Sequence, residues 1–166
     1  RYEKDINAQI AEQLKQAFLR ENIQVEMTRS GDDFVSLEQR VQSTNAWQPD
    51  LMISIHANAV EQRPEVRGLQ VLYYPDEAGQ NMRFAEETMQ HLIAETGATD
   101  KGVIARPELA VLRGTNVQAL LIETGFLSNP EEAELLATPA YQQQLVKGLV
   151  QAVLQQLEVL KQTETQ

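Results

Sequence analysis

The chain has 166 residues, which is enough for one hydrophobic core of ordinary size and too few for two. Hydrophobic residues make up 42% and charged residues 23%, as in typical globular domains, and no apolar run approaches the roughly 20 residues that a membrane-spanning helix needs. The formal net charge of -10 argues against a nucleic-acid partner, because binding to phosphates needs clustered Lys and Arg. We therefore expect a single domain with no nucleic-acid partner and no membrane span.

The chain contains no cysteine, so disulfides and thiolate zinc sites are excluded. His and carboxylate side chains remain as the strong metal ligands that the sequence can supply. The sequence opens on Arg1 without a methionine, and we expect that a further segment lies upstream.

The first third of the chain predicts two helices and a strand. Apolar residues recur every four positions over residues 4–20, the pattern of an amphipathic helix that packs on a sheet. Alternating apolar residues over 23–29 predict a short strand with one better-buried face. Ser36 and Gln39 form a capping-box pattern, so a helix is expected to begin there and to end near Asn45.

The remaining two thirds predict further strands and helices in alternation. Leu51–Ile55 lacks alternation, which predicts an interior parallel strand covered on both faces. Other strands are expected at 68–74, 109–113 and 119–122, and other helices at 81–95, 130–137 and 139–160. The expected fold class is α/β: a single layered domain, residues 1–160, whose mostly parallel twisted sheet is flanked by helices on both faces, followed by a polar tail, 161–166.

Two predicted strands end on a residue that can carry chemistry. His56 follows one apolar strand, and Glu123 follows another. In open α/β sheets ligands bind outside the carboxyl ends of the strands, and a carboxylate there is costly to desolvate unless a hydrogen bond or a positive group meets it. Taken singly, His56 fits either a metal ligand or a structural histidine bonded to a loop carbonyl. Glu123 fits either a catalytic acid or a carboxylate that accepts backbone N–H groups of its loop.

Other polar residues have simpler interpretations. Glu3 precedes the first helix, where an acidic residue usually complements the helix dipole. His91 lies inside a predicted helix without a second ligand four residues later, so we interpret it as a partly exposed helix residue. Neither histidine has the Ser and Asp partners of a serine hydrolase.

Five strings in this order make the sequence recognisable: YEKDINAQIAEQL, VEMTRSGDDFVSLEQRV, DLMISIHAN, GLQVLYY and ALLIETGFLSN. Together they resemble the zinc-dependent N-acetylmuramoyl-L-alanine amidases of bacterial cell walls, of the AmiC and LytC type. The resemblance extends over almost the whole chain, and its most diagnostic parts are SIHAN and E-x-G-F-x-S-N.

The resemblance implies roles for three residues. In that family two histidines and one glutamate hold zinc, and a late glutamate performs acid/base work. The matching positions make Glu3 and His56 metal ligands and Glu123 the catalytic residue. The family's other histidine lies in an Asp-Pro-Gly-His-Gly-like loop ahead of the Glu3 position, and neither histidine of this chain matches it. We therefore expect the first strand and the first His ligand to lie upstream.

The implied activity is a zinc-dependent peptidoglycan hydrolase. It cleaves the amide bond between the lactyl group of N-acetylmuramic acid and L-alanine of the stem peptide. The implied partner is a glycan strand carrying stem peptides, the implied location is outside the cytoplasm in the periplasm or cell wall, and we expect a monomer. The alternative is a non-catalytic amidase-like module that binds the cell wall, or an inactive fragment.

One departure from the family concerns regulation. Division-associated amidases carry a long helix that blocks the zinc site between the SIHAN strand and the next strand. Here that interval is Ala59–Arg67, which is too short for such a helix. We therefore expect no self-inhibition by this route.

Overall fold

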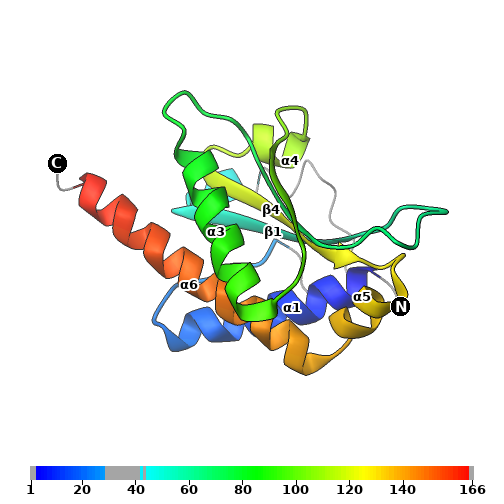
Figure 1. The fold of residues 1–166 in the computed structure, drawn as a ribbon. Helices are drawn as coiled ribbons and strands as arrows, with labels where there is room; N and C mark the ends of the chain where they lie inside the picture. The colour runs from blue at the N-terminus through cyan, green and yellow to red at the C-terminus, as the bar shows by residue number, and fades with distance from the viewer. Residues whose placement is uncertain (1–2, 29–41, 43, 165–166) are drawn as a thin grey trace.

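The computed structural model describes residues 3–28, 42 and 44–164, and Figure 1 shows its layers. In chain order its elements are α1 (Glu3–Arg20), β1 (Leu51–Asn58), β2 (Leu69–Tyr73), α3 (Gln80–Thr96), β3 (Asp100–Ala105), α4 (Ala110–Arg113), β4 (Gln118–Phe126), α5 (Pro130–Leu136) and α6 (Pro139–Glu164).

The described strands form one sheet in the order β1-β4-β2-β3. β1 pairs with β4 and β2 pairs with β3 in parallel, whereas β2 and β4 are antiparallel. The predicted α/β class is confirmed. The sheet is mixed, with parallel pairing at two of its three strand interfaces.

Alternate residues of each strand face two different apolar layers. Leu120 and Ile122 of β4 point into the larger core, where α1, α3 and α6 cover the sheet. Leu121 points to the opposite face and packs with Leu72 and with Leu112 of α4. Figure 1 shows α4 on the side of the sheet away from α1 and α6. Helices therefore lie on both faces of the sheet. The carboxyl ends of β1 and β4 lie near the start of α1, which belongs to the thicker helical layer.

The predicted helices with clear start and stop signals are confirmed. The four-residue apolar stripe of α1, made by Ile6, Ile10, Leu14 and Phe18, is buried. α3 ends at Gly97, whose φ of 67° suits a residue without a side chain. α5 begins after Asn129, whose side chain accepts a hydrogen bond from the Glu132 N–H.

Residues 109–113 were predicted as a strand, and that prediction is wrong: Ala110–Arg113 is the short helix α4. The Arg113 N–H donates to the Leu109 carbonyl at 2.8 Å, a helical bond. An apolar run of so few residues has no measurable period, so the pattern could not distinguish helix from strand.

The strand β3 was not predicted from the sequence, because half of its residues are exposed and a glycine, Gly102, interrupts it.

Three further expectations need correction. Residues 23–28 form no strand; Ile23 and Val25 pack against the core, but alternation reports burial and not backbone pairing. β1 was expected to be interior and fully covered, yet it is an edge strand of the described sheet and is mostly half-buried. The last helix was expected to end at residue 160, but α6 continues to Glu164, and Lys161 in its last turn complements the helix dipole.

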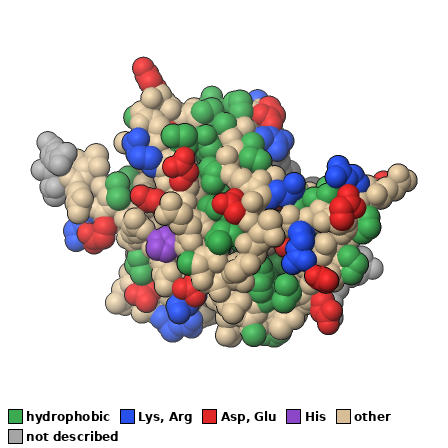
Figure 2. All heavy atoms as spheres, viewed as in Figure 1, with side chains coloured by type: hydrophobic (Ala, Val, Ile, Leu, Met, Phe, Trp, Pro, Cys, Tyr) green, Lys and Arg blue, Asp and Glu red, His purple; other side chains and the backbone are tan. Residues whose placement is uncertain are grey.

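The helix predicted from Ser36 lies mostly outside the described residues, although residues 44–47 are helical. Within the described part of the chain, none of the helices has the length and apolar character required to cross a membrane. On the face shown in Figure 2, acidic and basic side chains are interspersed, so the described residues there form no basic patch of the kind that binds nucleic acid.

Candidate active site

The candidate site lies where β1 and β4 end side by side. His56 of β1 is the register partner of Glu123 of β4, and Glu123 is also opposite Gln70 of β2. Strand alternation puts the His56 and Glu123 side chains on the same face as Leu121. The two residues that were predicted from strand ends are therefore neighbours in the sheet.

Both ring nitrogens of His56 have polar neighbours. Nδ1 lies 3.4 Å from Oε1 of Glu3, and Nε2 lies 3.0 Å from Oγ of Ser54. The hydroxyl can either donate to Nε2 or accept from it, depending on which nitrogen carries the proton. The imidazole is thus held from two sides, with one nitrogen directed at a carboxylate.

Glu3 reaches this site from the first turn of α1. Its Oε1 accepts hydrogen bonds from the Ala57 N–H at 3.4 Å and from the Asn7 side-chain amide at 3.3 Å. Because Glu3 is in α1 and Ala57 is in β1, the carboxylate joins the start of the helix to the end of the strand. The contact of Glu3 with β1 is more than an acidic residue in the first turn of a helix needs in order to complement the helix dipole.

Glu123 is the most perturbed acid of the site. Its Oε2 is buried and has no hydrogen-bond partner among the described residues. Burial raises the pKa of the Glu123 carboxyl from an ordinary 4.5 to about 7; the Glu3 carboxylate adds to the rise, and the Arg106 guanidinium opposes it. A carboxyl group with a pKa near neutrality can both accept and return a proton, which is what acid/base catalysis requires.

The donor set accommodates part of a zinc site. One imidazole nitrogen and one carboxylate oxygen converge, and both are ligands that zinc accepts. Catalytic zinc usually has three protein ligands, and within residues 3–28, 42 and 44–164 no group of three His, Asp or Glu side chains is arranged to hold a metal ion. Among the described residues, Glu3 and His56 could offer two of the three ligands, and the assignment of all three site residues remains a prediction.

The second histidine is not part of this site. His91 lies in α3, and its Nε2 is 2.7 Å from Oε1 of Gln155 in α6. The structure agrees with its interpretation as a partly exposed helix residue.

The contact of Ser54 with His56 was not predicted, although the spacing of the two residues indicates it. Ser54 is two residues before His56, and residues at this spacing share a face of a strand. Arg106 was also missed: it follows β3, and its side chain donates to Glu108 while its charge acts on Glu123. Such an effect arises from the packing of separate strands, which local sequence does not encode.

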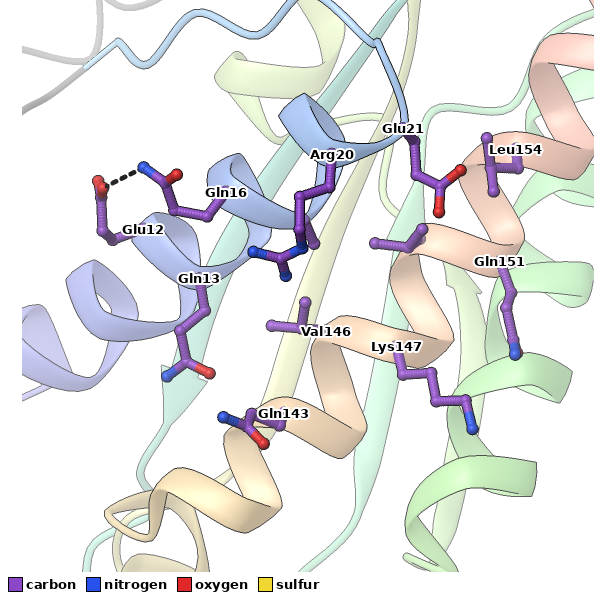
Figure 3. A pocket seen from close by; sticks show the side chains of 12 residues that line it. Glu12, Gln13, Gln16, Arg20, Glu21, Gln143, Val146, Lys147, Gln151 and Leu154 are labelled. Atoms are coloured by element: carbon purple, nitrogen blue, oxygen red, sulfur yellow. Dashed lines mark hydrogen bonds between the residues drawn. The ribbon is translucent and has the colours of Figure 1, made fainter.

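A groove between α1 and α6 lies away from the candidate site. Figure 3 shows Gln13 and Arg20 of α1 facing Val146 of α6 across it. None of the three predicted site residues lines the groove.

Two solved structures that superpose on this chain are amidases. An N-acetylmuramoyl-L-alanine amidase from Clostridium difficile 630 superposes with a TM-score of 0.90 at 34% identity, over 95% of this chain and 85% of that chain. The catalytic domain of CwlV, an N-acetylmuramoyl-L-alanine amidase from Bacillus (Paenibacillus) polymyxa var. colistinus, superposes with a TM-score of 0.87 at 29% identity, over 95% and 86% of the two chains.

Sequence comparison leads to the same class. Residues 1–155 match the family model described as N-acetylmuramoyl-L-alanine amidase. The chain belongs to the N-acetylmuramoyl-L-alanine amidase family. It is also 31% identical over 148 residues to a probable cell wall amidase, LytH, of Staphylococcus aureus, with 89% of this chain and 47% of that protein aligned. This chain thus spans about half the length of the staphylococcal relative.

Proposed function

We propose that this chain is a zinc-dependent hydrolase that cleaves the amide bond between the lactyl group of N-acetylmuramic acid and L-alanine in peptidoglycan. Membership of the amidase family supports the reaction class. The observation that carries the assignment of residues is the placement of Glu123 beside His56, with the Glu3 carboxylate 3.4 Å from the His56 ring. We also propose that the protein acts outside the cytoplasm, where this substrate is found.

Glu3 and His56 would hold the zinc ion, through Oε1 and Nδ1, together with a ligand from outside the described residues. When bound, zinc supplies a Lewis acid that polarises a carbonyl oxygen and makes water more acidic. Ser54 would orient the His56 ring through its contact with Nε2.

Glu123 would move the protons. In its ionised form the carboxylate removes a proton from the attacking water, and the protonated carboxyl then delivers a proton to the nitrogen of the departing L-alanine. Proton delivery is needed because an amide breaks readily only when its nitrogen leaves as an amine. A carboxyl with a pKa of about 7 fits both halves of this cycle near neutral pH.

The test uses purified muropeptides and follows release of free stem peptides by mass spectrometry. We expect zinc-dependent release by the chain. Replacement of the buried acid, Glu123→Gln, should lower turnover by several orders of magnitude while zinc binding is retained. The exposed residue Glu158 provides a charge-matched control, and Glu158→Gln should leave turnover unchanged.

Two outcomes would contradict the proposal. Unchanged turnover in Glu123→Gln would remove Glu123 from its role. Binding of muropeptides by the zinc-supplied chain without any release would favour a non-catalytic cell-wall binding module instead.

A further inference from the structure

A second glutamate, buried behind the candidate site, forms an unusual set of bonds. Glu132 of α5 is only 3% exposed. Its Oε1 accepts two backbone hydrogen bonds at 2.9 Å each, from the N–H groups of Gly68 and Phe126. A buried carboxylate that accepts backbone N–H groups forms strong, charge-assisted hydrogen bonds.

The two donors lie together on one side of the Glu123–Gln70 pair, because β2 and β4 are antiparallel. Phe126 is three residues after Glu123 in β4, and Gly68 is two residues before Gln70, the residue opposite Glu123 in β2. A single oxygen of Glu132 therefore joins the end of β4, just beyond Glu123, to the start of β2.

The strand is also irregular at this point. The β1–β4 register is His56↔Glu123 and then Asn58↔Phe126, so β4 has one extra residue directly after Glu123. Bulges interrupt the ladder, are uncommon in parallel pairs, and re-aim side chains near active sites. Here the Phe126 N–H at the end of the bulge donates to Glu132, which holds the irregular segment in place.

The backbone that carries the Glu132 carboxylate is anchored at the start of α5. The Glu132 N–H donates to Oδ1 of Asn129 at 2.9 Å, and the Asn129 side-chain amide donates to the Pro64 carbonyl at 2.9 Å. Gly125 lets α5 come this close, because a Cβ on that residue would be 3.3 Å from the Glu132 carboxylate. The end of β4, the loop before β2 and the start of α5 thus form one connected unit.

We propose that Glu132 is a positioning residue that fixes the direction of the Glu123 side chain by holding the bulge of β4 against the start of β2. This inference rests on the catalytic role proposed for Glu123. Without the Glu132 carboxylate, two buried N–H groups lose their acceptor and the bulge can relax. A displacement of the base by about 1 Å is enough to lower the rate by about 100-fold.

The test compares three substitutions of Glu132 in the zinc-supplied chain, each assayed well below its melting temperature. Glu132→Gln keeps an oxygen at the same reach and should retain kcat within a few-fold. Glu132→Asp keeps the charge but withdraws the acceptor, and should lower kcat by about 10- to 100-fold with little change in KM. Glu132→Ala should lower kcat at least as much.

A control separates positioning from general stability. Thr88 is buried in α3, and its hydroxyl donates only to a helix carbonyl, that of Phe84. Thr88→Val should therefore leave kcat unchanged. If Glu132→Ala does not fold, the contrast between the Gln and Asp variants still decides the question.

The inference is overturned if Glu132→Asp keeps the kcat of the unmodified chain, or if Glu132→Gln is as impaired as Glu132→Asp. Either result leaves the proposed function intact, because that proposal is tested separately by Glu123→Gln. Loss of kcat in the Asp variant with rescue in the Gln variant supports the positioning role.

Discussion

Among the three residues of the candidate site, Glu123 is the one whose protonation the fold alters most. Its buried Oε2 has no partner among the described residues, and the Glu3 carboxylate adds negative charge nearby. Both conditions favour the protonated form. The pKa of the Glu123 carboxyl is therefore about 7 in the folded protein, whereas in the unfolded chain the group ionises near 4.5. The same property that suits the group for proton transfer therefore affects stability.

The stability of the metal-free protein should depend on pH through Glu123. Because the folded-state pKa is raised, the contribution of Glu123 to the free energy of unfolding is fully present below pH 4.5 and is lost as the pH rises through 7. We expect the free energy of unfolding of the unmodified chain, relative to that of Glu123→Gln, to fall by roughly 2 kcal/mol across this range, less than a fully buried group would give because solvent screens part of the effect.

Urea unfolding of both proteins in the presence of a chelator, at intervals from pH 4 to 8, measures this difference. The Glu123→Gln variant is the control for all other titrating groups, because it shares them with the unmodified chain. Parallel stability curves for the two proteins would show that Glu123 titrates as an ordinary exposed acid.

The residues of the candidate site divide into those that local sequence can identify and those that it cannot. His56 and Glu123 were found because each follows an apolar strand, and Glu3 was found through the family resemblance. Ser54 and Glu132 were not found, because their roles depend on contacts. The Glu132 carboxylate meets an N–H group 64 positions away in the sequence, and no local pattern reports such a contact.

At the scale of the elements, the start of β2 depends on Gly68. Its φ is +123°, and a Cβ there would lie 2.8 Å from the Thr99 carbonyl oxygen, which belongs to backbone that cannot move aside easily. Its N–H is one of the two donors to Glu132. Conformation and close packing both require glycine here, and the hydrogen bond to Glu132 adds only the need for a backbone N–H.

Gly68→Ala should destabilise the protein more than Gly97→Ala. Both glycines have positive φ, but a Cβ on Gly97 would meet nothing within 4 Å. The Gly97 variant therefore carries only backbone strain, about 1 kcal/mol, and the Gly68 variant should lose at least about 2 kcal/mol because it adds a steric clash. Denaturant unfolding measures both values, and equal losses would show that the approach of Thr99 is not limiting.

Each element could be predicted to the extent that clear sequence features mark it. α1, α3, α5 and α6 were predicted because periodic apolar stripes, caps, prolines and Gly97 mark them. α4 and β3 were not, because one is too short to show a period and the other is half exposed. The antiparallel pairing of β2 with β4 also could not be predicted, since the direction of a strand depends on connections that have no local signature.

At the scale of the whole molecule, the candidate site joins two layers of the fold. Glu3 belongs to the helical layer and His56 to the sheet, and their side chains meet only when α1 packs on β1. A metal ion held by both would bind the folded state and not the unfolded chain. Metal binding is therefore expected to stabilise the entire domain.

Zinc should raise the melting temperature of this chain, and a chelator should reverse the rise. At a zinc concentration 100 times the dissociation constant, the stabilisation is about 2.7 kcal/mol, which corresponds to an increase of several degrees. His56→Ala removes a proposed ligand and should abolish the shift, whereas His91→Ala removes the histidine that contacts Gln155 in α6 and should preserve it. Because the two variants lose the same metal-binding group from different places, a shift of equal size in both would mean that zinc binds elsewhere, and the pairing of Glu3 with His56 would then have to be explained as a structural contact alone.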